Sequence, residues 1–176
     1  MADSTGAARW QDELYDLLRR NKITQFAYVP DAGHRILIDR SLADPGARSV
    51  ALTTEEEGVA LLAGADLGGA RAVLLMQSSG VGNCINTFTM LHVCGFPCLL
   101  VVTMRGEFAD FNPWQVPMGL ITEPALKGCG FLTCRIERAD DVEAIVGSAC
   151  DMAYNGGLRV AVLLAQRLVE AGRGGH

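Results

Sequence analysis

The sequence lacks the marks of several protein classes. Its 176 residues carry 15 lysine and arginine side chains against 20 aspartate and glutamate side chains, so basic charge is not in excess. Nucleic-acid-binding proteins usually present a basic face, and we therefore do not expect a nucleic-acid partner. No apolar run is long enough to cross a bilayer, and the N-terminal segment has no basic region followed by an apolar one. We expect neither membrane insertion nor secretion, and predict a cytoplasmic protein.

Metal-binding and disulfide patterns are also missing. None of the six cysteines forms a Cys-x-x-Cys pair, and the three histidines are not at metal-ligand spacing. We therefore predict no metal site in this chain and interpret the cysteines as reduced, mostly buried side chains of a cytosolic protein. One alternative is a cysteine hydrolase that uses Cys84, because a thiolate is favoured at the start of a helix. It requires a partner base, and no motif connects His34 or His92 to Cys84.

Known phosphate-binding loops are absent as well. The segment "MQSSGVGNCIN" (76–86) follows an apolar run, but it lacks the third glycine of a dinucleotide fingerprint and the lysine of a P-loop. What it does offer is a polar loop at the start of a helix, where free N–H groups suit a carboxylate or another anion. Ordinary turn and cap chemistry explains the same residues, and the loop alone leaves both interpretations open.

Apolar runs alternate with helical patterns along the whole chain. Strands are predicted at 25–29, 48–54, 71–77, 96–104, 131–136 and 159–165, and helices at 9–21, 35–42, 55–69, 80–95, from 121 and at 139–157, with a long loop over 105–119. Continuous apolar strands are typical of a parallel sheet that is covered on both faces. The prediction is an α/β three-layer sandwich with a mostly parallel sheet, forming a single domain over 1–170 with a disordered tail at 171–176. Ligands of such sheets bind at the carboxyl ends of the strands.

The segment "TTEEEGVALLAGADLGG" (53–69) combines three glutamates with a helix that is apolar on every side. Thr54 and Glu57 have the spacing of a capping box, which explains part of the acidity. A helix that is apolar all round is buried, here in a subunit interface. The mean hydropathy of +0.21 is high for a short acidic chain, and it also indicates apolar surface buried against a partner, with self-association. A glutamate at the mouth of such a helix is a candidate for sharing or passing a proton.

Several segments together resemble one family. "YVPDAG", "TTEEEGVALLAGADLGG", "LLMQSSGVGNCINTFTML", "FPCLLVVTMRGEF" and "WQVPMG" cover most of 28–119 in order. They resemble the pyrimidine-binding domain of thiamine-diphosphate-dependent decarboxylases, in particular sulfopyruvate decarboxylase alpha subunits and the matching half of phosphonopyruvate decarboxylases. The resemblance implies the thiamine-diphosphate-binding fold, a carbon–carbon lyase that decarboxylates a 2-oxo acid, and a glutamate that hydrogen-bonds a ring nitrogen of the cofactor's aminopyrimidine. Counting back from Gly64 selects Glu55 for this role, with Glu57 and Glu56 as alternatives.

The same resemblance assigns further site residues. It implies that the cofactor-binding loop contains Gln77, Ser78, Ser79, Gly80 and Asn83. Asp31 matches a loop that reaches the active site, and its neighbour His34 is a candidate proton shuttle or a structural histidine. Arg105 is a candidate partner for a substrate sulfonate or phosphonate, or a member of an ordinary salt bridge. Gln115 is a further candidate for substrate binding.

One half of the family's site is missing from the sequence. The family holds the diphosphate and Mg²⁺ with a Gly-Asp-Gly motif followed by an asparagine, and this chain contains no Gly-Asp-Gly. The resemblance therefore implies a hetero-oligomer with a beta subunit that carries this motif. Sulfopyruvate is favoured as the substrate, with phosphonopyruvate as the alternative. A non-catalytic scaffold domain of the same fold is the alternative of another class.

Overall fold

The chain folds around one parallel sheet. The computed structural model describes residues 5–171, and it contains a six-stranded sheet with the order β2-β1-β3-β4-β6-β5. Every neighbouring pair is parallel, which confirms the predicted sheet type. The strands are β1 (Ile23–Tyr28), β2 (Arg48–Ala51), β3 (Arg71–Gln77), β4 (Cys98–Thr103), β5 (Leu132–Ile136) and β6 (Arg159–Leu164).

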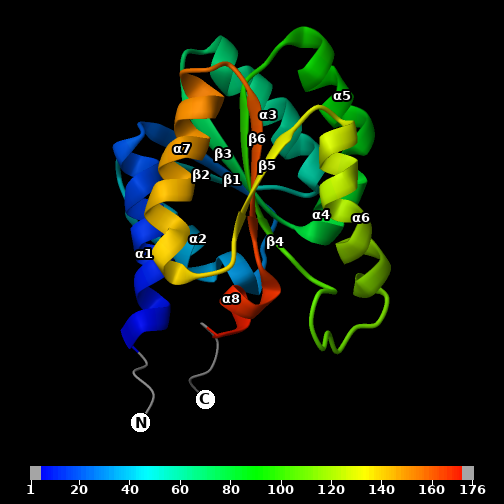
Figure 1. Cartoon of the computed structure of the whole chain (residues 1–176). Helices are drawn as coiled ribbons and strands as arrows, with labels where there is room; N and C mark the ends of the chain where they lie inside the picture. The colour runs from blue at the N-terminus through cyan, green and yellow to red at the C-terminus, as the bar shows by residue number, and fades with distance from the viewer. Residues whose placement is uncertain (1–4, 172–176) are drawn as a thin grey trace.

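Helices cover both faces of the sheet (Figure 1). One face carries α1 (Thr5–Arg20), α2 (Arg35–Ala43), α7 (Val142–Tyr154) and α8 (Gln166–Ala171), and the other carries α3 (Glu55–Leu67), α4 (Ser78–Asn83), α5 (Ile85–Cys94) and α6 (Gln115–Gly128). Short 3-10 helices, η1 (Ala32–His34) and η2 (Ala139–Asp141), precede α2 and α7. The predicted three-layer sandwich is confirmed. Between residues 5 and 171 no helix has both the length and the apolar character needed to cross a bilayer.

The two faces of the sheet bury separate hydrophobic cores. Neighbouring residues of one strand point to opposite cores, as Leu74 and Leu75 of β3 do, and both are fully buried. Both faces of a parallel sheet covered in this way must be apolar, which is why the strands appear in the sequence as continuous apolar runs. β3 occupies the residues predicted for it, 71–77.

The strand order creates a switch point between β1 and β3. From β1 the chain passes through α2 on one face to β2, and then through α3 on the other face to β3, on the far side of β1. The connections leave β1 and β3 in opposite directions, and this opens a crevice at the carboxyl ends of the two strands. In Figure 1 this edge lies at the bottom of the molecule, where the loop after β4 begins and α8 starts.

Most helix and strand boundaries differ from the prediction by a few residues, and three differences are larger. α6 begins at Gln115, six residues before the predicted start, because Pro117 lies in the first turn, where a helix tolerates proline. The helix predicted over 80–95 is split into α4 and α5 at Cys84. α8 was not predicted, since six residues are too few for a helical period to show. Of the predicted disordered tail, Ala171 belongs to α8 and the rest lies outside the described residues.

Candidate active site

Three of the strand-end loops border one cavity. It measures about 220 Å³ and lies at the switch point between β1 and β3. Its walls come from the loop after β1, the first residue of α3, the end of β3 and the start of α4: Val29, Pro30, Asp31, Glu55, Gln77 and Ser79. The fourth loop, after β4, contacts the cavity indirectly through Asp31. The structure thus collects the polar loops that the sequence placed at the carboxyl edge.

Glu55 is held on two sides. The Asn83 amide donates a hydrogen bond of 3.0 Å to Glu55 Oε2. Gly80 lies directly beneath the side chain, where a Cβ atom would approach Glu55 Cγ to 2.5 Å and Oε1 to 2.7 Å. Oε1 accepts no hydrogen bond from any residue between 5 and 171. The contacts therefore fix the carboxylate by one oxygen and leave the other available to a ligand.

The two neighbouring glutamates are placed differently. Glu57 Oε2 accepts a hydrogen bond of 2.8 Å from the backbone N–H of Thr53, and the Thr54 side chain makes no capping bond. The predicted capping box is thus corrected: Glu57 caps the start of α3, but through Thr53. Glu56 is exposed. Of the three glutamates, Glu55 is the one that lines the cavity.

Gln77 is the centre of a hydrogen-bond network in the cavity wall. Its Oε1 accepts from Ser79 Oγ at 3.0 Å and from Gln115 Nε2 at 3.3 Å, and its Nε2 donates to Asp31 Oδ1 at 3.3 Å. Thr103, at the end of β4, donates to Asp31 Oδ2 at 2.8 Å. Thr103 was missed in the sequence because it lies inside the predicted buried strand 96–104. The network connects four separate segments of the chain across the carboxyl edge.

Two predicted site residues lie behind the cavity. His34 is fully buried, and its Nε2 lies 3.1 Å from the Met76 carbonyl oxygen, a contact that requires the proton on Nε2. Nδ1 has no partner. Ser78 is also fully buried, and its Oγ accepts a hydrogen bond of 3.1 Å from the backbone N–H of Arg105. Neither side chain lines the cavity, which favours the structural alternative for His34. The cofactor-binding role of Ser78 stays a prediction.

The buried His34 predicts a pH dependence of stability. Burial lowers the pKa of His34, although the charge of Asp31 and the Met76 carbonyl oppose the shift. Unfolded histidine titrates near pH 6.5, so below about pH 6.5 the unfolded state takes up a proton first. The free energy of unfolding should fall there by up to about 1.4 kcal/mol per pH unit, and should gain nothing from His34 above it. Urea unfolding of the wild-type and His34→Gln chains from about pH 5 to 8 measures this. Parallel pH profiles of the two chains would contradict the expectation.

Arg105 is occupied by an internal ion pair. Its Nε and Nη2 donate to the two Asp110 oxygens at 2.7 and 2.6 Å, and the Asp110 side chain is fully buried. The Arg105 guanidinium holds the pKa of the Asp110 carboxyl well below its usual range. The pair uses Nε and Nη2 and leaves Nη1 without a bond to Asp110, so the salt-bridge alternative is observed. Substrate binding by Arg105 stays a prediction.

Cys84 does not have the environment of a nucleophile. The residue is fully buried at the junction of α4 and α5. Burial, with the nearby charges of Glu55 and Glu56, raises the pKa of its thiol to about 12. The thiol therefore stays protonated near neutral pH, and the cysteine-hydrolase alternative is wrong. All six cysteines are free thiols. Within residues 5–171, no group of three or more histidine, cysteine, aspartate or glutamate side chains could hold a metal ion.

Comparison with known proteins relates this geometry to a family. The sulfopyruvate decarboxylase subunit alpha of Methanocaldococcus jannaschii is 30% identical over 151 residues, which cover 85% of this chain and 89% of the relative. The subunit of the same name from Methanothermobacter thermautotrophicus is 32% identical over 77% of this chain and 83% of its own length. The chain belongs to the sulfopyruvate decarboxylase alpha-subunit family. No family model matches the chain.

Two further proteins are similar to the chain over part of their own length. Phosphonopyruvate decarboxylase of Streptomyces viridochromogenes is 37% identical over 109 residues, but these cover only 28% of that protein. Among solved structures, the 2-oxoglutarate:ferredoxin oxidoreductase of Magnetococcus marinus superposes with a TM-score of 0.74 over 91% of this chain at 17% identity, which shows a shared fold alone. The sulfopyruvate decarboxylase alpha subunits are thus similar over nearly their whole length, whereas the other two proteins extend well beyond the match.

Proposed function

We propose that the chain is the pyrimidine-binding alpha subunit of a thiamine-diphosphate-dependent enzyme that decarboxylates sulfopyruvate to sulfoacetaldehyde and CO₂. The observation that carries the proposal is the position of the Glu55 side chain and the contacts that hold it. It lines a cavity at the switch point, is fixed by Asn83 and Gly80, and keeps one carboxylate oxygen free. Membership of the sulfopyruvate decarboxylase alpha-subunit family supports the reaction class, a carbon–carbon lyase.

The cavity fits an aminopyrimidine ring. Val29 and Pro30 provide an apolar wall, and Glu55 provides a carboxylate at the edge of the same space. A flat heterocycle with ring nitrogens needs both an apolar surface for its face and a hydrogen-bonding group for its edge. When bound, thiamine diphosphate supplies the electron sink into which the bond to carbon dioxide breaks.

The residues of this chain manage position and protons. Glu55 would hold or pass a proton at Oε1 toward a ring nitrogen of the bound cofactor, and Asn83 fixes the carboxylate by its bond to Oε2. Ser79 and Gln115 fix the orientation of Gln77, which in turn holds Asp31 beside the cavity. Asp31 lines the same space and is our candidate for handling protons on the substrate. These side chains are preorganised for the reaction, because hydrogen bonds among them already fix their positions.

A beta subunit supplies the rest of the site. The chain has no Gly-Asp-Gly, so the diphosphate and Mg²⁺ are assigned to that partner. The sulfopyruvate decarboxylase of Methanosarcina acetivorans supports this division, since the present chain spans only 41% of its length and the remainder is further sequence. Arg105 stays our candidate for the sulfonate, because its pair with Asp110 uses Nε and Nη2 and not Nη1. Self-association and a cytoplasmic location stay predictions.

The test is an assay of the reconstituted enzyme. The alpha chain, the beta subunit, thiamine diphosphate and Mg²⁺ are expected to release CO₂ from sulfopyruvate, whereas the alpha chain alone is expected to release almost none. Phosphonopyruvate, assayed in parallel, is expected to react more slowly. An active lone chain, shown to be free of other proteins, would refute the split enzyme. A complex that assembles but acts on neither substrate would support the scaffold alternative.

A further inference from the structure

The exposed apolar side chains are concentrated on one side of the molecule. Of the large hydrophobic residues that are exposed, most lie on α5, on α6 or in the loop before α6: Ile85, Met90, Val93, Phe108, Phe111, Trp114, Val116, Leu120 and Ile121. Among residues 10–171, the helices α1, α2, α7 and α8 expose only Leu42 in this way. Figure 1 shows α5, α6 and the loop together on the right of the sheet. Exposed apolar side chains that gather on one side of a protein indicate an interaction site.

The loop between β4 and α6 presents three aromatic side chains. We call residues 106–114 the aromatic loop. Phe108, Phe111 and Trp114 are 49%, 78% and 69% exposed. Two arginines lie over the rings, with Arg105 Cζ 5.0 Å from the Phe111 centroid and Arg167 Cζ 4.2 Å from the Phe108 centroid. Aromatic residues and arginine are the types that dominate the energy of protein–protein interfaces.

A buried carboxylate fixes the backbone of the aromatic loop. Asp110 Oδ2 accepts from the Gly106 N–H at 2.9 Å, and Oδ1 accepts from the Asn112 N–H at 3.0 Å. Both oxygens also bind the Arg105 guanidinium. Asp110 therefore connects Arg105 and Gly106, at the start of the loop, with Asn112, near its end. The aromatic rings remain exposed on the outside of the loop.

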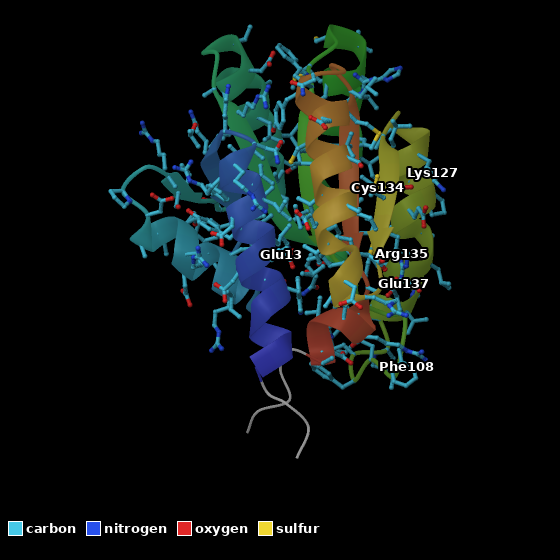
Figure 2. All side chains as sticks on the ribbon, turned by 60° about the vertical axis from the view of Figure 1, so that its left-hand side comes forward. Glu13, Phe108, Lys127, Cys134, Arg135 and Glu137 are labelled. Atoms are coloured by element: carbon cyan, nitrogen blue, oxygen red, sulfur yellow. The ribbon has the colours of Figure 1, made fainter. Side chains whose placement is uncertain are left out.

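Gln166, the first residue of α8, holds the same loop from the other side. Its side chain is 1% exposed, and its Oε1 accepts from the N–H groups of Glu107 at 2.9 Å and Phe108 at 3.2 Å. Its Nε2 donates to Asp110 at 3.2 Å and to Glu170 at 2.7 Å. All hydrogen-bonding capacity of the amide is used. Figure 2 shows Phe108 at the lower end of the molecule, beside the ribbon of α8.

The aromatic loop adjoins the cavity. Trp114 precedes Gln115, whose amide donates to Gln77 in the cavity wall. Thr103 and Arg105, on the other side of the loop, connect to Asp31 and Ser78. A subunit that completes the site from outside must therefore approach this edge and meet the loop.

We propose that the aromatic loop is a preformed docking element for the beta subunit, with Phe111 and Trp114 as its anchors and Asp110 and Gln166 as the residues that hold its shape. The inference rests on the proposed function for the identity of the partner. A loop that is already ordered loses little conformational entropy on binding, and this favours affinity. The polar contacts between α8 and the loop thus keep the loop ordered, and the exposed rings provide the surface that contacts the beta subunit.

The two tryptophans of the chain make a direct test possible. Trp10 is 2% exposed in the core and Trp114 is 69% exposed in the aromatic loop. The alpha chain is labelled with 5-fluorotryptophan and titrated with purified, unlabelled beta subunit, which is first isolated with the wild-type chain and identified by its Gly-Asp-Gly motif. The ¹⁹F resonance of Trp114 is expected to shift on binding, and that of Trp10 is expected to stay in place.

Variants measure the contribution of the loop. Phe111→Ser combined with Trp114→Ser is expected to weaken binding of the beta subunit by at least about 100-fold. Gln166→Ala, which keeps the rings and frees the backbone, is expected to weaken it by about 10-fold. Leu42→Ser changes a 60% exposed side chain on α2, on the other face, and is expected to leave affinity within about 2-fold. Circular dichroism confirms that each variant is folded.

The outcomes distinguish the docking element from the proposed function. Wild-type affinity in the double variant, or a Trp114 resonance that stays in place while the complex forms, would overturn the docking element and leave the proposed function intact. A Trp114 resonance that moves with the concentration of the alpha chain alone would assign the loop to a second copy, and would also overturn it. Failure to isolate any Gly-Asp-Gly partner would overturn both proposals.

Discussion

Glu55→Gln is expected to lower kcat of the alpha–beta complex by about 10²- to 10⁴-fold, the usual contribution of a general acid–base group. The amide can still accept the hydrogen bond from Asn83, so the side chain should keep its seat, but it can no longer take up and return a proton. Assembly and the affinity for thiamine diphosphate should change much less than kcat. Steady-state kinetics with sulfopyruvate and a titration of the complex with cofactor measure the two effects separately.

The neighbouring glutamates provide the matched controls. Glu56 is exposed and Glu57 binds the Thr53 N–H, so Glu56→Gln and Glu57→Gln are expected to keep kcat within about 3-fold. Glu57→Gln should cost about 1 kcal/mol of stability through the weakened cap. If Glu57→Gln lost activity and Glu55→Gln kept it, the assignment of the glutamate would move by two positions along α3.

Gly80→Ala is expected to lower kcat of the complex by about 100-fold while the chain stays folded. The new Cβ would lie 2.5 Å from Glu55 Cγ, so Glu55 must move by roughly 1 Å, and a misplacement of that size can cost about 10² in rate. Gly80 lies in α4 with an ordinary helical backbone, where alanine is the better helix former. Thermal unfolding should therefore show little loss of stability.

Gly147→Ala is the control for this substitution. Gly147 lies in α7 on the opposite face of the sheet, and a Cβ there would meet nothing within 4 Å. The variant should gain up to about 1 kcal/mol of stability from helix propensity and keep full activity. Wild-type activity in Gly80→Ala would mean that the contact with Glu55 does not set its position.

The sequence predicts the strands and the layers of this fold better than it predicts short helices and the ends of helices. β3 was predicted at its observed residues because parallel strands buried on both faces must be apolar throughout. α8 was missed because its six residues are defined by contacts rather than by a period: Gln166 is buried only because Glu107, Phe108 and Asp110 meet it. The start of α6 was missed because its first turn contains a proline and a glycine, which also occur in loops.

The candidate site was predictable where it follows from topology. Carboxyl ends of parallel strands share one edge, so Asp31, Glu55 and Gln77 had to lie near one another, and they line one cavity. Partners within the fold could not be read from the chain. Asp110 lies five residues beyond Arg105, and nothing in the sequence indicates that it binds the guanidinium. Nothing in the sequence around His34 indicates that its ring is fully buried. Which polar side chain faces the ligand depends on these tertiary contacts.

The most direct test of the account is a crystal structure of the alpha–beta complex with thiamine diphosphate and Mg²⁺. The account predicts that the aminopyrimidine lies in the cavity between Pro30 and Ser79, with a ring nitrogen within hydrogen-bonding distance, about 2.7–3.2 Å, of Glu55 Oε1. It also predicts that Asn83 still holds Oε2. A pyrimidine bound against Glu56 or Glu57, or a cofactor held entirely by the beta subunit, would contradict the central role of Glu55.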